Sequence, residues 1–340
     1  MCEQAVQSIL AVWNSKAPGR ALHVSRAWGG NRLIEPQDGS FHVVVSTYQQ
    51  LVSWSENRDQ YDWLTNPDAV FIDEAHGATA PSYTGIVEWL GGTTWQRSTL
   101  PLIGLSATPF RGTSEEETKR LVNRFGQRRF DVEAFEDDEN RYQDLQNRGI
   151  LAKVQQREIR GGELSLSATE RQQANDMRWL PKSVATKLGR DAERTRRIVD
   201  EVLALPEDWP VLVFAPSVEN SEDLATLLTA KGRRARSIIG TTPTPERDRA
   251  IQQFKDGHVK VLTNYDVLTQ GFDAPTVRAV VVARPTSSMN LYQQMIGRGL
   301  RGPLNGGSDE VLILNVADNI KNYGQEMAFQ QFERLWKEVD

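Results

Sequence analysis

Short apolar runs without polar alternation constrain the fold of this 340-residue chain most strongly. Stretches of helical character separate the runs, which lie at residues 21–25, 43–46, 69–72, 102–105, 211–214, 236–239, 259–263, 279–283 and 311–314. A strand that is apolar on both faces is typical of a parallel sheet covered by helices on both sides. The pattern therefore predicts an α/β protein with two parallel sheets and crossover helices.

The runs form two groups, and the segment between them lacks the pattern. This segment contains an acidic stretch at 133–139 and a pair of glycines at 161–162. We expect a first lobe at residues 1–130, an inter-domain insert or linker at 131–195, and a second lobe at 196–340. Inside the insert, a helix is expected at 168–177.

Charge and composition narrow the class of protein. A net charge of −5 argues against a broadly basic coat for nucleic acid. The single cysteine, Cys2, cannot form an intramolecular disulfide and fits a reducing compartment. No apolar run reaches the length of a membrane span, and no signal-peptide pattern begins the sequence. We therefore expect a cytoplasmic protein without membrane contact.

Two carboxylates come directly after the run at 69–72. Asp73 and Glu74 begin the tetrapeptide Asp-Glu-Ala-His at 73–76. Ligands bind beyond the carboxyl ends of parallel strands, so acids in this position can reach a bound phosphate ester. Asp73 can hold Mg²⁺, and Glu74 can orient or deprotonate an attacking water. An ion pair within a loop is the alternative interpretation.

Hydroxyl residues follow the run at 102–105 in the same way. Ser106 and Thr108 belong to the tetrapeptide Ser-Ala-Thr-Pro. We expect them at the sheet edge that carries Asp73, where short hydroxyls can relay hydrogen bonds between a site and a neighbouring element. A helix cap or a turn is the alternative.

Gln294, Arg298 and Arg301 have the spacing of residues on one face of a helix, which we expect to run from about 289 to 302. The glycines that flank Arg298 each cost about 1 kcal/mol in a helix, so another part of the molecule must approach closely there. Planar arginine donors suit the charge that develops on a transferred phosphoryl group. A surface helix with ion pairs is the alternative.

A further motif follows the run at 259–263. It extends from Thr263 to Asp273. Gly271 would allow close approach of the backbone to a ligand, and Asp273 could accept a hydrogen bond from a ribose hydroxyl. A turn capped by a polar side chain is the alternative.

In this order, the motifs resemble those of the superfamily-two helicases and translocases. The similar segments are 43–51 for motif Ib, 73–76 for motif II, 106–108 for motif III, 211–217 for motif IV, 263–273 for motif V and 294–301 for motif VI. The residues of the last two segments resemble most the DEAD/DEAH-box group allied to restriction-enzyme motors and XPB-like DNA translocases.

The resemblance implies two RecA-like parallel-sheet lobes that hydrolyse ATP in the cleft between them and move on nucleic acid, with DNA favoured over RNA. In that family the acids of motif II bind Mg²⁺ and activate water, and motif VI senses the γ-phosphate. The implied catalytic residues are Glu74, Gln294, Arg298 and Arg301. The implied nucleotide and metal residues are Asp73, His76, Gly271 and Asp273.

The resemblance also implies residues for coupling and for strand binding. Ser106 and Thr108 are the residues implied to couple the state of the nucleotide to the bound nucleic-acid strand. Contacts to the nucleic-acid backbone fall to Thr47, Tyr48, Ser217 and Thr263. Such contacts are largely to phosphates, so they depend on salt and carry little sequence information.

The sequence departs from the family in one respect. No lysine follows a glycine, so the phosphate-binding loop G-x-x-x-x-G-K-[ST] is absent. Residues 2–5 resemble the end of motif Ia, which predicts a chain that starts after this loop and a first lobe that lacks the P-loop strand. The run at 102–105 would then have an open edge. Without the loop, ATP loses its main positive cradle, and we expect weak binding.

Three explanations of this departure stay open. The chain is a truncated motor, or one half of a split motor completed by a partner subunit that carries the loop, or an inactive nucleic-acid-binding or regulatory module. A nuclease or methylase partner is compatible with the family. A dehydrogenase or a glycosyltransferase is disfavoured, because no G-x-G-x-x-G follows a strand and neither class explains the acids and arginines.

Overall fold

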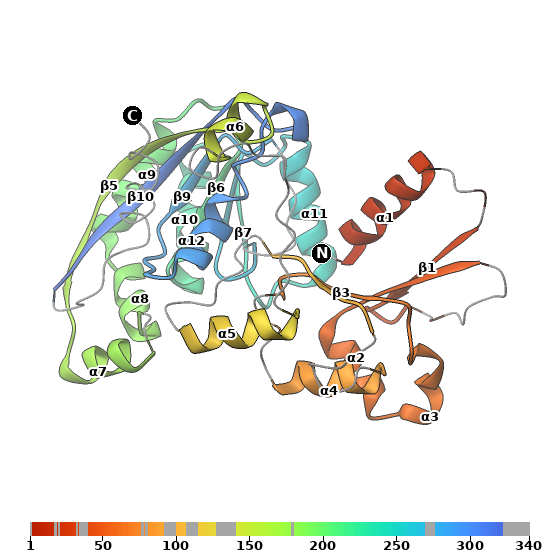
Figure 1. Ribbon diagram of the computed structural model, residues 1–340. Coiled ribbons are helices and arrows are strands. Elements are labelled where there is room, and N and C mark those ends of the chain that lie inside the picture. Colours follow the sequence, from red (N-terminus) through yellow and green to blue (C-terminus); the bar gives the residue numbers. More distant parts are fainter. Residues whose placement is uncertain are drawn as a thin grey trace. The chain divides into compact units, whose positions relative to one another are not determined.

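The structure is a computed structural model. It describes residues 2–16, 19, 21–31, 33, 40–75, 78, 81–91, 100–106, 115–126, 141–177, 180–268 and 276–321. The chain divides into two compact units, Met1–Val132 and Glu133–Asp340. Figure 1 shows the elements of both units along the chain.

The first unit contains two pairs of parallel strands in its described part. β1 (Leu22–Ala27) pairs with β2 (Phe41–Ser46), and β3 (Val70–Ile72) pairs with β4 (Leu102–Gly104). These strands coincide with the four apolar runs of the first group. Among the described residues, β4 has β3 as its one neighbouring strand.

The described part of the first unit has six helical elements, and four of them contribute to a small aromatic core. The six elements are α1 (Cys2–Lys16), α2 (Tyr48–Ser55), α3 (Arg58–Tyr61), the 3-10 helix η1 (Asp62–Leu64), α4 (Pro81–Trp89) and α5 (Glu115–Arg124). Trp54 of α2 and Trp89 of α4 are buried in this core with Ile86 and Leu64. Nowhere in the described part of the chain does a helix combine the length and the apolar character needed to cross a membrane.

The second unit is built on a parallel sheet of six strands, in the order β5-β10-β9-β6-β8-β7. The strands are β5 (Lys153–Ser165), β6 (Val211–Phe214), β7 (Ala235–Ile238), β8 (Val261–Asn264), β9 (Ala279–Val282) and β10 (Glu310–Lys321). β6 to β10 each overlap one of the five apolar runs of the second group, and β10 extends well beyond its run. The prediction of buried parallel strands is therefore confirmed.

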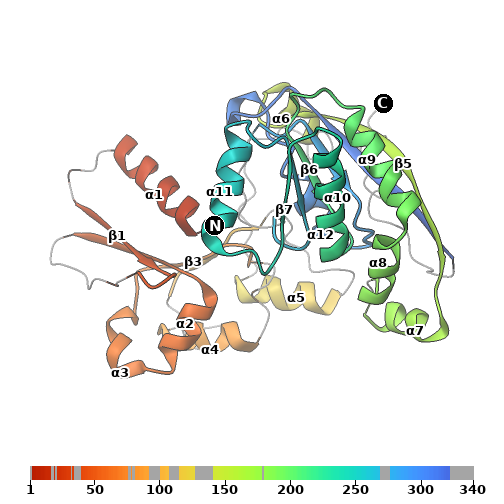
Figure 2. The same cartoon turned by 180° about the vertical axis from the view of Figure 1, so that it is seen from behind.

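Both faces of this sheet are covered by helices, as its sequence requires. The helices of the unit are α6 (Arg141–Asn147), α7 (Ala168–Met177), α8 (Lys182–Gly189), α9 (Ala192–Leu203), α10 (Val218–Ala230), α11 (Thr244–Lys255), α12 (Met289–Ile296) and the 3-10 helix η3 (Pro303–Asn305). Leu212 and Phe214 of β6 pack in one core with α12, and Val211 and Val213 pack in another with α9 and α10. Figures 1 and 2 show these two layers from opposite sides.

The structure differs from the expectation for residues 131–195. β5 comes from this segment, and it pairs with β10 along almost its whole length. α6, α7 and α8 also lie in the second unit, and α7 has the bounds expected from the sequence. β5 is an edge strand of the sheet, and an edge tolerates charged side chains that a central strand excludes.

Buried polar side chains fasten this segment to the rest of the second unit. Asn220 of α10 donates to the carbonyl of Gly189, at the end of α8, at 2.8 Å. Arg194 of α9 pairs with Asp318 of β10, and both side chains are at most 1% exposed. The segment is therefore an integral part of the second unit.

A histidine in the first unit makes its stability depend on pH. His42 of β2 accepts or donates a hydrogen bond with the Ser25 hydroxyl at 2.8 Å and stacks on Trp63. Burial, together with the nearby His23, holds the pKa of His42 below its ordinary value of 6.5. The unfolded chain then binds a proton more readily than the folded chain. Stability that is present above the unfolded-state pKa of 6.5 is therefore lost as the pH falls through the lower, folded-state pKa.

We expect acidification from about pH 8 to about pH 5 to weaken the protection of β1 and β2 in hydrogen exchange. His42→Gln should flatten this dependence, because glutamine does not titrate. His258→Gln is the matched control, since His258 is exposed in the second unit. The same steep dependence in His42→Gln would contradict the assignment to His42.

Candidate nucleotide and nucleic-acid sites

The two predicted acids form a sharp turn directly after β3. Asp73 is exposed, and its Oδ1 accepts a hydrogen bond from the backbone N–H of Glu74 at 2.9 Å. The backbone of Glu74 has φ 51°, in the left-handed region that costs free energy for a residue other than glycine. Strained backbone of this kind clusters at functional sites, and this turn places the exposed Asp73 just beyond the strand.

Backbone hydrogen bonds join this acid turn to the segment after β4. The N–H of Leu105 donates to Ile72 O at 2.9 Å, and the N–H of Ala75 donates to Leu105 O at 2.9 Å. Ser106 follows Leu105 directly, so it lies at the same sheet edge as the acids. The expected adjacency of these segments is confirmed, whereas His76 and Thr108 lie outside the described residues.

Thr47 and Tyr48 begin α2. Thr47 is the N-cap, and its hydroxyl accepts a hydrogen bond from the N–H of Gln50 at 3.3 Å. Tyr48 stacks on Tyr83 of α4, with ring centroids 4.2 Å apart. Sequence reasoning missed Tyr83, because its stacking on Tyr48 joins two helices and no local sequence pattern indicates it. A helix start beside an aromatic ring suits a nucleic-acid strand.

The helix expected to carry the glutamine and both arginines is shorter than predicted. α12 ends at Ile296, so Gln294 lies on the helix and Arg298 lies in the turn that follows it. Arg301 forms an antiparallel β-bridge with Leu151. The prediction that the three residues share one helical face was therefore wrong.

The flanking glycines explain why the helix ends early. Gly297 is the C-cap, and beyond it the N–H of Gly299 bonds to the carbonyl three residues back instead of four. A Cβ at Gly299 would lie 2.8 Å from a methyl group of Val311 and 2.9 Å from one of Val280. The expected close approach is confirmed, and the sheet is what approaches.

The three side chains nevertheless stay in the same short stretch of chain. Gln294, Arg298 and Arg301 are all half-buried. Burial lowers the pKa of the Arg301 guanidinium from its ordinary value. An arginine keeps its charge at neutral pH even so, and therefore remains able to bind a phosphate.

Two of the predicted strand contacts are buried instead. Thr263 is 0% exposed, and its hydroxyl donates to the carbonyl of Ser221 at 2.7 Å. Ser217 is the expected N-cap of α10, but it is 6% exposed and accepts from the N–H of Asn220. Direct contact of these hydroxyls with a strand is not supported, because both already serve the packing of α10. Gly271 and Asp273 lie outside the described residues.

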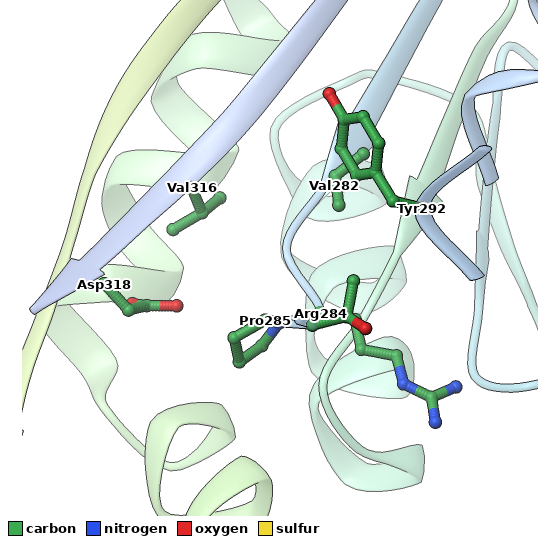
Figure 3. A pocket seen from close by; sticks show the side chains of 7 residues that line it. Val282, Arg284, Pro285, Tyr292, Val316 and Asp318 are labelled. Carbon is green, nitrogen blue, oxygen red and sulfur yellow. The ribbon is translucent and has the colours of Figure 1, made fainter. Parts of the chain in front are cut away.

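Sequence reasoning missed an ion pair that joins the motif carrying Gly271 to the end of β9. Arg284 forms an ion pair with Asp266, whose φ is 58°, and its guanidinium lies 5.1 Å from the ring centre of Tyr265. A small pocket lies beside it, between the end of β9, α12 and β10. Figure 3 shows the Arg284 guanidinium directed away from Asp318, on the opposite side of this pocket.

Two family models match the chain. The model of the type III restriction enzyme res subunit matches residues 1–111, and that of the helicase conserved C-terminal domain matches residues 194–302. Together they cover more than half of the sequence and contain the acid turn and the arginines. The chain belongs to the superfamily-two helicases. This is an ATP-hydrolysing enzyme family.

Individual relatives of this helicase agree with the family models. The putative ATP-dependent helicase IRC3 of Saccharomyces cerevisiae is 27% identical over 265 residues, which are 76% of this chain and 35% of that protein. The putative mitochondrial ATP-dependent helicase irc3 of Schizosaccharomyces pombe is 31% identical over 261 residues, which are 74% of this chain and 38% of that protein. The chain thus spans about a third of the length of these relatives.

A solved structure shows that the fold is shared. Dbp5 of Saccharomyces cerevisiae, bound to RNA and ADP BeF3, aligns with a TM-score of 0.59 and 16% identity over 98% of this chain and 72% of that one. Identity this low speaks for the fold alone. The prediction of RecA-like lobes is confirmed by this likeness.

The acid turn of the helicase fits a magnesium ion. The exposed carboxylate of Asp73 is a hard oxygen donor, and Mg²⁺ in nucleotide sites takes one or two carboxylates and completes its shell with water and phosphate oxygens. Among the described residues there is no cluster of three metal-ligating side chains. Asp73 would therefore hold the ion together with the phosphates of a nucleotide.

Proposed function

We propose that this chain carries the hydrolytic part of a DNA translocase of the DEAD/DEAH-box type. The observation that supports this most is the pair of backbone hydrogen bonds in which Leu105 donates to Ile72 O and accepts from Ala75 N, which set the acids beside Ser106. In the proposal, Glu74 orients the attacking water and Asp73 holds Mg²⁺, which neutralises charge on the phosphates. Ser106 senses the state of the nucleotide and relays it.

The second unit contributes the positive groups in this proposal. Arg298 and Arg301 stabilise the charge on the transferred phosphoryl group, and Gln294 helps to position it. In the proposal, the acids and the arginines act on the same nucleotide, and Gly271 and Asp273 are assigned to its binding. Strand contacts are assigned to Thr47 and Tyr48, at the start of α2.

One sequence feature favours a second candidate function. The 340 residues contain no glycine–lysine phosphate loop, so we expect the chain by itself to bind ATP with low affinity. A nucleic-acid-binding module without turnover is consistent with this. A partner subunit that supplies the loop would restore turnover, and a nuclease or methylase partner is compatible with the motor.

Hydrolysis by the wild-type chain separates the two functions. We expect phosphate release from ATP that rises on addition of single-stranded DNA more than on addition of RNA, and that does not saturate until ATP reaches millimolar concentrations. Strand binding without any phosphate release would support the module without turnover. A chain that neither binds DNA nor hydrolyses ATP would contradict both functions.

The salt dependence of strand binding gives an independent measure. Contacts to phosphates predict that binding weakens steeply as salt rises, with a log–log slope set by the number of phosphates neutralised. A fluorescently labelled oligonucleotide of mixed sequence is suitable for this titration. Binding that is insensitive to salt would argue against a backbone-tracking site.

A further inference from the structure

The stretch that carries both arginines is paired with a segment far from it in sequence. We call residues 297–307 the arginine turn and residues 146–152 the clamp segment. The two lie side by side, as Figures 1 and 2 both show for α6 and the chain that precedes β10. Backbone hydrogen bonds of 3.0 Å run from Ala152 N to Leu300 O, from Gly302 N to Ile150 O and from Leu304 N to Gly149 O.

One amide side chain reinforces this pairing, and a second one braces the clamp segment itself. Nδ2 of Asn305, in the arginine turn, donates to the carbonyl of Ile150 at 2.9 Å. Nε2 of Gln146, at the end of α6, donates to the carbonyl of Ala152 at 3.1 Å. Each amide thus binds a carbonyl of the clamp segment, on either side of the bridge between Leu151 and Arg301.

Two glycines of the arginine turn have no room for a side chain. A Cβ at Gly302 would lie 2.3 Å from the carbonyl oxygen of Gly149, and a Cβ at Gly307 would lie 1.8 Å from that of Arg301. On its other side the turn is held by Ser308, whose hydroxyl donates to Val277 O at 3.4 Å. Contacts on both sides therefore limit the movement of this turn.

If the arginines bind a phosphate, this contact would hold them in a fixed position. Arg298 and Arg301 lie beyond the end of α12, so the helix does not fix their backbone. A misplacement of about 1 Å in a catalytic group costs up to about 100-fold in rate. Backbone pairing to a second segment supplies the rigidity that the helix lacks.

We propose that Gln146 and Asn305 are positioning residues that hold Arg298 and Arg301 in the geometry for binding a phosphate. The inference rests on the proposed function for its ligand. It gives a role to the clamp segment, which the family resemblance leaves without one. Neither amide touches the nucleotide in the proposal. Asn305 ties the arginine turn to Ile150, and Gln146 holds Ala152, whose N–H binds Leu300 O of the arginine turn.

Asn305→Asp tests the proposal with a nearly isosteric change. The aspartate cannot donate to Ile150 O, and its charge opposes that carbonyl. Asn319→Asp is the matched control, because Asn319 is exposed near the far end of β10. Gln146→Glu is the second variant, which removes the other amide donor and keeps the test valid should the first variant fold poorly.

Two NMR measurements on the full chain report the behaviour of the arginine side chains. The ¹⁵N relaxation of the Nε–H groups of Arg298 and Arg301 reports their order, and their chemical shifts report binding of inorganic tripolyphosphate. We expect Asn305→Asp and Gln146→Glu to increase the motion of both groups and to weaken tripolyphosphate binding by about fivefold, the loss of one neutral hydrogen bond. Melting temperature should stay close to that of Asn319→Asp.

The outcomes distinguish the inference from the proposed function. Unchanged order and unchanged tripolyphosphate affinity in both variants would overturn the positioning role. Increased motion with unchanged affinity would also overturn it, because the amides would then serve the fold alone. A wild-type chain whose arginines do not respond to tripolyphosphate would instead contradict the proposed function.

Discussion

Arg194→Ala is expected to lower the free energy of unfolding of the second unit by about 3–5 kcal/mol. The Arg194 guanidinium donates to the two carboxylate oxygens of Asp318 at 2.7 and 2.8 Å. The side chains are 0% and 1% exposed, so the pair is removed from water. Loss of the arginine leaves a buried carboxylate without its counter-charge, which is among the most costly single changes in a protein.

The same substitution disconnects several elements. Arg194 also donates to the carbonyl of Ala283, at the end of β9, and Asp318 accepts from the N–H of Gly162 in β5 at 2.8 Å. One ion pair thus joins α9, β5, β9 and β10. We expect the protection of β5 and β10 in hydrogen exchange to fall first, because these strands form one end of the sheet.

A matched control lies on the same helix. Arg196 pairs with Asp200 at 3.1 Å, but both side chains are largely exposed, and Arg196→Ala should cost less than about 0.5 kcal/mol. Urea unfolding of the wild type, Arg194→Ala and Arg196→Ala compares their free energies of unfolding. The double change Arg194→Met with Asp318→Leu should recover part of the loss, because it removes both charges. Equal stabilities for Arg194→Ala and Arg196→Ala would refute this account of the pair.

Strand prediction worked where strands are buried and failed where one is not. β6 is apolar at every position, including Val211 and Val213, so the short apolar run itself indicates the strand. β5 reads Lys-Val-Gln-Gln-Arg-Glu-Ile-Arg, and its charged residues point to a linker. Its place in the sheet comes from pairing with β10, which lies over a hundred residues away in sequence. Such a partner leaves no local pattern.

The candidate sites show the same limit. The turn after β3 was predictable, because an acid beyond a buried strand end has a recognised position in parallel sheets. The end of α12 was not, because the close approach of the sheet to Gly299 is a tertiary contact. The burial of Thr263 was missed for a similar reason. Its hydroxyl binds Ser221 on α10, which no spacing in the sequence relates to it.

Glu74→Gln is expected to lower the rate of ATP hydrolysis by about 10²–10⁴-fold. Glutamine keeps the size of the side chain and removes the carboxylate to which we assign the orientation and deprotonation of water. The backbone of the acid turn should persist, because Asp73 still accepts from the N–H of residue 74. DNA binding should persist as well, since the strand contacts are assigned to other residues. The effect is therefore expected on turnover alone.

A control carboxylate is available in the same unit. Glu88 is exposed on α4, so Glu88→Gln changes the net charge by the same amount without touching the acid turn. The control removes the general effect of charge on DNA and nucleotide affinity. Asp73→Asn provides a further comparison, because loss of the metal ligand should raise the Mg²⁺ concentration needed for half-maximal activity.

The most direct test of the central claim is phosphate release at saturating single-stranded DNA and millimolar ATP, measured side by side for the wild type, Glu74→Gln and Glu88→Gln. The acid turn as the hydrolytic site predicts DNA-stimulated release by the wild type and by Glu88→Gln, and at most about 1% of that rate in Glu74→Gln. DNA-stimulated release that survives Glu74→Gln would contradict the claim.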